Sequence, residues 1–174
     1  MLKKKMINGA NIEDFPEARI CTLQEYIDVC KTYGCRPMIE IKDPRTEKMQ
    51  DLYDLLKKND ILKSCILISF HLSDLRAMRK IDENLEMWYL VNYITNKVIR
   101  NAKQANLGVA FCAQYNAVRP EYIKKVLDNG LTAACWTVDD KDLLLKMLDC
   151  GVRYITTNSI LPSAAALAQA QKTN

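Results

Sequence analysis

PMIEIKD, residues 37–43, is the stretch that decides the fold class of this chain. It is short and apolar and follows a helical pattern that ends at Gly34, which is typical of a strand buried on both faces in a parallel sheet. Side chains alternate across a strand, so Met38, Glu40 and Lys42 share one side of it. A carboxylate and an ammonium on the buried side of a core strand are costly unless they pair, bind a metal or meet a charged ligand. The spacing alone leaves open a structural ion pair, or a strand end where both charges reach water, beside a ligand site.

The same pattern of a helix followed by a short apolar run recurs along the chain. The first helix is predicted to begin at Thr22, which forms a capping box with Glu25. Six strands that alternate with helices predict right-handed βαβ units in a parallel sheet. Four glycines fall between a helix and the next strand, where a left-handed residue ends a helix: Gly34, Gly108, Gly130 and Gly151. The predicted strands are 37–42, 65–70, 87–91, 109–112, 132–138 and 152–157, and the predicted helices are 22–34, 46–58, 72–80, 95–105, 120–130, 140–149 and 162–171.

Two architectures fit this alternation, a doubly wound open sheet and part of a (β/α)8 barrel. The chain has no G-x-G-x-x-G or G-x-x-x-x-G-K-[ST] phosphate loop, which weakens the nucleotide-binding versions of the open sheet. In a barrel the C-terminal ends of the strands converge on one mouth, where active sites lie. Polar side chains recur at those ends, which favours an incomplete TIM (β/α)8-type barrel of about six parallel strands; they are Glu40, Lys42, Ser69, His71, Asn92, Gln114, Trp136, Asp139 and Asn158.

The composition is that of an ordinary soluble globular domain, predicted to span residues 1–174, with 49% hydrophobic and 26% charged residues. The net charge of +4 is mild, and apart from Lys3-Lys4-Lys5 the basic residues are scattered, which argues against nucleic acid as a partner. No stretch approaches 18 consecutive apolar residues, so no membrane span is predicted. Seven cysteines without a C-x-x-C pair, and a single histidine, argue against structural zinc and indicate reduced thiols in a cytoplasmic protein.

Five segments, taken in order, carry a family resemblance. They are Cys21-Thr22-Leu23-Gln24-Glu25, Ile39-Glu40-Ile41-Lys42, Ile68-Ser69-Phe70, Trp136-Thr137-Val138, and Gly151-Val152 leading to Ile155-Thr156-Thr157-Asn158. The series resembles the glycerophosphodiester phosphodiesterase family, a (β/α)8 barrel, over about residues 20–160. Each segment alone is weak, but their order and spacing together are fairly specific.

The resemblance implies metal-assisted hydrolysis of glycerophosphodiesters to an alcohol and glycerol 3-phosphate. It implies that Glu40 is a metal carboxylate for a divalent cation, calcium or magnesium, that Lys42 faces the substrate phosphate, and that Trp136 lines the glycerol end of the pocket. The chemistry agrees with these residue types, because hard cations prefer carboxylate oxygens and a phosphodiester needs its charge offset during attack.

The chain departs from the family pattern in its first part. The family begins with a strand ending in His-Arg-Gly, followed by a Glu-x-Asp pair and a His-Asp segment, which together supply both catalytic histidines and two of three metal carboxylates. The chain has none of these motifs, so no catalytic residue is assigned, and weak or absent cation binding is expected. We therefore expect an N-terminally incomplete domain that is inactive or weak alone. The alternatives are a non-catalytic phosphate-ligand-binding or assembly module, and a gene remnant with a misassigned start.

His71 is the chain's only histidine and follows the strand end Ser69-Phe70. Its position at a strand end predicts that it faces the mouth, and its intrinsic pKa suits acid–base work. Two interpretations stay open, a residue at the pocket rim where a helix starts, and a direct contact with the substrate.

A six-stranded part of a barrel has two edge strands without a neighbour, near residues 37–42 and 152–158. Unpaired edges and an uncovered apolar interior promote association with another chain. We expect Met38, Ile66, Ile68 and Ala134 to meet water unless something covers them, with the first 20 residues too polar to replace two βα units. The sequence thus predicts self-association or a complementary partner chain, beside a glycerophosphodiester-type small molecule.

Overall fold

The computed structural model describes residues 19–159 of the chain. The chain divides into two compact units, residues 1–36 and residues 37–174. Helix α1 (Leu23–Thr32) lies in the first unit, and all six described strands lie in the second. The predicted final helix at 162–171, the predicted basic run Lys3-Lys4-Lys5 and most of the first 20 residues lie outside the described part.

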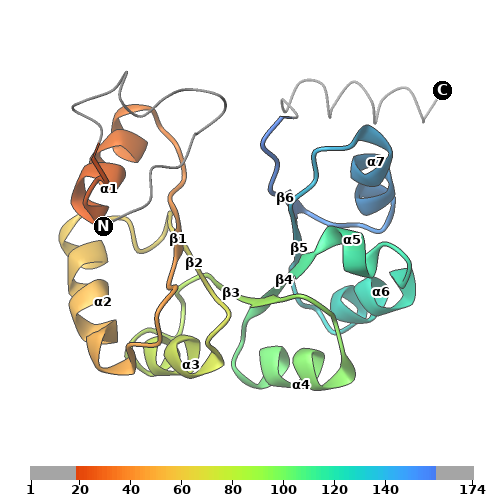
Figure 1. Ribbon diagram of the computed structural model, residues 1–174. Coiled ribbons are helices and arrows are strands. Elements are labelled where there is room, and N and C mark those ends of the chain that lie inside the picture. Colours follow the sequence, from red (N-terminus) through yellow and green to blue (C-terminus); the bar gives the residue numbers. More distant parts are fainter. Residues whose placement is uncertain (1–18, 160–174) are drawn as a thin grey trace, which may run out of the picture. The chain divides into compact units, whose positions relative to one another are not determined.

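The second unit is built on one parallel sheet, in which the strands lie side by side in chain order (Figure 1). Every neighbouring pair is parallel, and the connections between strands contain helices. Six parallel strands that alternate with helices form part of a (β/α)8 barrel, as the sequence predicts. The strands are β1 (Met38–Glu40), β2 (Ile66–Ser69), β3 (Met87–Val91), β4 (Gly108–Cys112), β5 (Ala133–Trp136) and β6 (Tyr154–Ile155).

The helices of this unit follow the strands along one face of the sheet (Figure 1). A short α5 directly after β4 is an element that the sequence patterns miss, because four residues carry no helical period. A single turn of 3-10 helix, η2, replaces the predicted start of the second helix. The elements are η2 (Thr46–Lys48), α2 (Met49–Lys58), α3 (Leu72–Ile81), α4 (Asn96–Gln104), α5 (Ala113–Asn116), α6 (Pro120–Asp128) and α7 (Lys141–Asp149). None of the helices in residues 19–159 has the length and apolar character needed to cross a bilayer.

The other face of the sheet carries a cluster of alternating apolar side chains. Ile66, Trp88, Leu90, Ala110 and Ala134 are buried there, with Met38, Ile68, Trp136 and Tyr154 packed against them. Ile66 and Ala134 are predicted to meet water unless something covers them, and their exposed fractions of only 2% and 4% show that they are covered. They are covered because bulky neighbours share their face; the Trp88 and Tyr154 rings lie 4.6 Å apart between centroids.

Gly108 corrects one prediction. Gly34, Gly130 and Gly151 do adopt positive φ after helices, but Gly108 does not; Asn106, with φ 50°, takes the left-handed position instead. Gly108 begins β4 beside Trp88, and a Cβ placed on it would lie 2.4 Å from Trp88 Cδ1. Glycine is therefore required at position 108 because a larger residue would clash with the indole ring of Trp88. A sequence pattern of helix ends cannot reveal this requirement.

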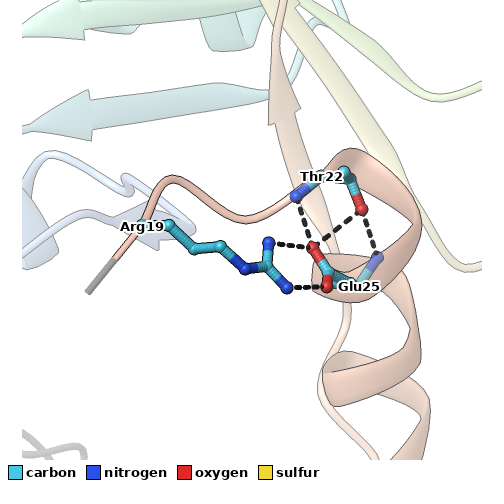
Figure 2. A network of polar contacts seen from close by, with 3 residues as sticks. All are labelled: Arg19, Thr22 and Glu25. Carbon is cyan, nitrogen blue, oxygen red and sulfur yellow. Dashed lines mark hydrogen bonds and ion pairs between the residues drawn. The ribbon is translucent and has the colours of Figure 1, made fainter. Parts of the chain in front are cut away.

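Helix α1 begins as the sequence predicts, with a reciprocal capping box (Figure 2). The Glu25 backbone N–H donates to Thr22 Oγ1 over 3.2 Å, and the Thr22 backbone N–H donates to Glu25 Oε2 over 2.8 Å. Arg19 adds a two-pronged ion pair, with Nη1 2.9 Å from Glu25 Oε2 and Nη2 bonded to Oε1. These contacts lower the pKa of Glu25 from 4.5 to about 2, with the Arg19 hydrogen bond as the largest cause.

The pH dependence of α1 follows from this lowered pKa. Because the folded pKa lies below the unfolded one, Glu25 stabilises the helix start fully above pH 4.5, and this stabilisation is lost as pH falls toward 2. NMR titration of the Glu25 carboxyl should give a pKa near 2 in the native chain and a value closer to 4.5 in Arg19→Gln. Identical titration curves in the two proteins would contradict the assignment to Arg19.

Candidate functional site

A cavity of about 440 Å³ lies against the apolar face of the sheet within the second unit. Its deep wall is apolar and includes Leu90 and Ala110, while charged and hydroxyl groups come from the C-terminal ends of β1, β5 and β6. This size and this mixture of an apolar wall with few polar groups are typical of small-molecule sites. The lining residues that carry polar side chains with charge or hydroxyl groups are Glu40, Lys42, Thr137, Tyr154 and Thr156.

Glu40 and Lys42 share the cavity side of the β1 segment, as the alternation predicts, and they form an ion pair. Lys42 Nζ lies 2.8 Å from Glu40 Oε2. The Lys42 side chain is 76% exposed and the Glu40 side chain 29% exposed, so the pair sits at the wet end of the cavity. Both interpretations that the spacing left open, a structural ion pair and charges that reach water, therefore describe part of the site.

The backbone that carries Lys42 is fixed by the neighbouring β2–α3 unit. Ser69 is fully buried, and its Oγ donates to the Ile41 carbonyl over 2.8 Å and accepts from the His71 backbone N–H over 3.0 Å. The His71 Nε2 atom lies 3.0 Å from the Lys42 carbonyl oxygen. Because a carbonyl only accepts, Nε2 is the protonated nitrogen in this contact. The Lys42 main chain is thus held from two sides while its ammonium stays exposed.

A buried acid fixes the loop that follows Lys42. Asp74, in the first turn of α3, is fully buried, and its Oδ1 accepts from Thr46 Oγ1 over 2.8 Å. Its Oδ2 also accepts from the Arg45 backbone N–H over 3.4 Å. A carboxylate at a helix N-terminus is stabilised by the helix dipole, so Asp74 serves as an anchor rather than a ligand of the cavity.

Trp136 ends β5 and lines the cavity, with Phe70 packed edge-on against it at 5.8 Å between ring centroids. Its Nε1 atom is buried and has no hydrogen-bond partner among residues 19–159. An indole N–H can only donate, so this donor is left unsatisfied, as is that of Trp88, within the described part of the chain. Cys135 also borders the cavity, but burial raises the pKa of its thiol to about 12, so it supplies no thiolate nucleophile at neutral pH.

The cavity brings together three of the four predicted site residues, Glu40, Lys42 and Trp136. His71 does not line it; it occupies the N-cap position of α3 and contacts the Lys42 backbone. Its predicted contact with substrate stays a prediction, and its observed position matches the interpretation as a residue at a helix start.

The described residues do not fit a divalent cation by themselves. No group of three or more His, Cys, Asp or Glu side chains within residues 19–159 could hold a metal ion. Glu40 is the one carboxylate among the described residues of the cavity lining, whereas calcium takes six to eight oxygen ligands. The metal role of Glu40 is therefore not supported by other ligands in this part of the chain.

The sequence patterns predict no role for Asn116, although they place Asn92 and Gln114 nearby at strand ends. Asn116 is fully buried, and its Nδ2 donates to the carbonyls of Asn92 and Cys112, both over 2.8 Å. Its Oδ1 accepts from the Ile94 backbone N–H over 3.0 Å. One amide thus joins the segments that follow β3 and β4. The sequence carries no signal of this role, because an asparagine four residues beyond a strand end belongs to no local pattern.

Asp139, predicted at the mouth, joins the ends of β5 and β6. Its Oδ1 accepts from the Asn158 backbone N–H over 2.6 Å, and its Oδ2 accepts from Asn158 Nδ2 over 3.1 Å. The Asn158 backbone hydrogen bond is the largest cause that lowers the pKa of Asp139. Asp139 is thereby used in strand-end packing and does not line the cavity.

Comparisons with known proteins point to one family. The sequence profile of the Glycerophosphoryl diester phosphodiesterase family matches residues 2–161. A glycerophosphodiester phosphodiesterase from Parabacteroides distasonis superposes with a TM-score of 0.75 at 22% identity, covering 97% of this chain and 76% of that one. A phosphodiesterase from Oleispira antarctica, in complex with the product sn-glycerol-3-phosphate, gives 0.74 at 17% identity, covering 93% of this chain and 65% of that one. At these identities the structures show the fold alone. No curated protein matches the chain.

Proposed function

Because the chain belongs to the glycerophosphoryl diester phosphodiesterase family, we propose that its cavity binds the glycerol phosphate part of a glycerophosphodiester. In this proposal Lys42 neutralises the phosphate, Trp136 contacts the glycerol end, and the apolar wall excludes water. The corresponding activity of this chain would be hydrolysis of such a diester to an alcohol and glycerol 3-phosphate, as a step of glycerophospholipid metabolism.

The observation that carries the proposal is the meeting of Glu40, Lys42 and Trp136, from two strands about 95 residues apart in sequence, around one cavity of about 440 Å³. Further support comes from the exposed Lys42 ammonium on a fixed backbone. The related phosphodiesterase from Oleispira antarctica holds sn-glycerol-3-phosphate, which is the ligand chemistry proposed here.

We further propose that this chain alone hydrolyses its substrate slowly or not at all. His71 is its only histidine, lies outside the cavity lining and is engaged with the Lys42 carbonyl, whereas a positioned acid–base group contributes about 10²–10⁴-fold to rate. A non-catalytic phosphate-ligand-binding module is the alternative that the same observation favours. Choline release from glycerophosphocholine, with calcium or magnesium added, measures the rate of hydrolysis. Robust turnover by the wild type that is lost in Glu40→Gln would contradict the proposal of slow or absent hydrolysis.

Lys42→Met should weaken binding of sn-glycerol 3-phosphate by about 10- to 100-fold, because a charge-assisted hydrogen bond contributes about 1.5–3 kcal/mol. Isothermal titration calorimetry on the full chain measures the affinity. Lys48→Met is the matched control, since Lys48 also pairs with an acid, Asp51, but does not line the cavity. Equal losses in both variants would show a general charge effect and would refute the role of Lys42.

We also propose association with a second chain, because β1 and β6 each have one edge without a neighbouring strand in the described sheet. Both edges are short, three and two residues, so pairing would be weak unless the flanking segments join it. Sedimentation over a concentration series tests this association, and a monomer at all concentrations would contradict it.

The seven cysteines are free thiols, which supports a reducing, cytoplasmic location.

A further inference from the structure

We infer that the Lys42 ammonium takes the place of a divalent cation at Glu40, so that this chain binds phosphate esters without a metal and Glu40 opposes that binding. The inference rests on the proposed function of the cavity. In a metal site Glu40 would promote binding of the phosphate, whereas in this cavity its charge opposes it.

Among residues 19–159 the charges that line the cavity are one acid and one base. Glu40 is the only Asp or Glu and Lys42 the only Lys or Arg of the lining in this part of the chain, and they lie 2.8 Å apart from Nζ to Oε2. The carboxylate is thus already neutralised from within the chain. A cation that approached Oε2 would meet the ammonium and would find no second carboxylate in the described lining, whereas calcium needs several oxygen ligands.

The ion pair is also easy to open. Lys42 is 76% exposed at its side chain, and exposed pairs of this kind contribute little because water and salt screen them. The Lys42 backbone stays fixed while this happens, since Ser69 holds the Ile41 carbonyl and His71 holds the Lys42 carbonyl. The ammonium can therefore exchange one oxygen anion for another without moving the strand end.

A phosphate ester and the Glu40 carboxylate then compete for one ammonium. A phosphate monoester carries up to two negative charges and three acceptor oxygens, so it is the stronger partner for Lys42 once it enters the cavity. Glu40 weakens binding of the ester in two ways: it pairs with the Lys42 ammonium, and it repels the anionic phosphate. Removal of the Glu40 charge should consequently tighten binding of the ester.

A metal site at Glu40 would predict the opposite change in affinity. If Glu40 held a cation that in turn bound the phosphate, Glu40→Gln would remove a ligand and weaken binding. If Lys42 binds the phosphate directly, Glu40→Gln should strengthen binding by about two- to fivefold, the range expected from an exposed ion pair. Glutamine keeps the size of the side chain, so the change is one of charge.

The experiment titrates sn-glycerol 3-phosphate into the full chain by calorimetry, in EDTA and separately in calcium or magnesium. We expect the wild-type affinity to agree within twofold among these buffers and to rise in Glu40→Gln. Glu47→Gln is the matched control, because Glu47 is exposed on η2 and does not line the cavity; its affinity should equal that of the wild type. Glycerol, which is uncharged, should show no gain in Glu40→Gln.

Each other result overturns the inference in a recognisable way. Wild-type binding that EDTA weakens tenfold or more, or weaker binding by Glu40→Gln, would show that a cation at Glu40 carries the ester, and the proposed function would survive. Equal gains in Glu40→Gln and Glu47→Gln would show a long-range charge effect in place of competition. No binding by the wild type in any buffer would refute the proposed function together with the inference.

Discussion

Asn116→Ala should lower the free energy of unfolding by about 2–4 kcal/mol, because each buried polar group left without a partner costs about 1–3 kcal/mol. The Asn116 amide makes three hydrogen bonds, to the Asn92 and Cys112 carbonyls and from the Ile94 N–H. Ile94 is fully buried, so water cannot easily replace the bond that its N–H loses. Chemical denaturation followed by circular dichroism measures the change.

Asn129→Ala is the matched control for this variant. Asn129 also caps a backbone carbonyl, that of Lys125, but it does so at the end of its own helix, where it also accepts from Lys103 at the surface. Its removal should cost less than about 1 kcal/mol. If the two variants lost equal stability, the buried amide would have no special part in joining the loops after β3 and β4.

Gly108→Ala should destabilise the second unit by about 1–3 kcal/mol through overpacking. The added Cβ would lie 2.4 Å from Trp88 Cδ1 and 3.0 Å from Trp88 Nε1. Trp88 is 2% exposed and has little room to move, because it packs in the cluster on the cavity face of the sheet. The unfolding free energy from denaturant titration is again the measurement.

Trp88→Ala provides the control in a double-mutant cycle. Alanine lacks both Cδ1 and Nε1, the two indole atoms nearest to the new methyl group, so it should relieve the contact. The double variant should therefore lose less than the sum of the two single variants, by about 0.5–3 kcal/mol. Additive losses would mean that the cost of Gly108→Ala does not come from Trp88.

The two proposals for the cavity make different demands on the same residues. Ligand binding needs only the exposed Lys42 ammonium, the Trp136 ring and the apolar wall, all of which the described residues supply. Hydrolysis needs in addition a positioned acid–base group, and His71 is turned to a backbone carbonyl. Binding measurements and turnover measurements are therefore informative separately.

The sequence by itself determined the alternation of strands and helices, the parallel sheet and the capping box at Thr22. These features depend on neighbours close in sequence: apolar runs bounded by turn residues, and a side chain that bonds three residues away. It also placed Glu40 and Lys42 on one side of a strand, because alternation is a local rule.

Only the tertiary structure decided what those residues meet. The pairing of Lys42 with Glu40, the hold of Ser69 and His71 on the β1 end, and the Trp88 ring over Gly108 are contacts whose geometry no local pattern specifies. Asn116 shows the reason most plainly, because its partners lie up to 24 residues away and come within reach only when β3 and β4 pair. Local chemistry fixes which way a side chain points, whereas the packing of the strands fixes which groups it reaches.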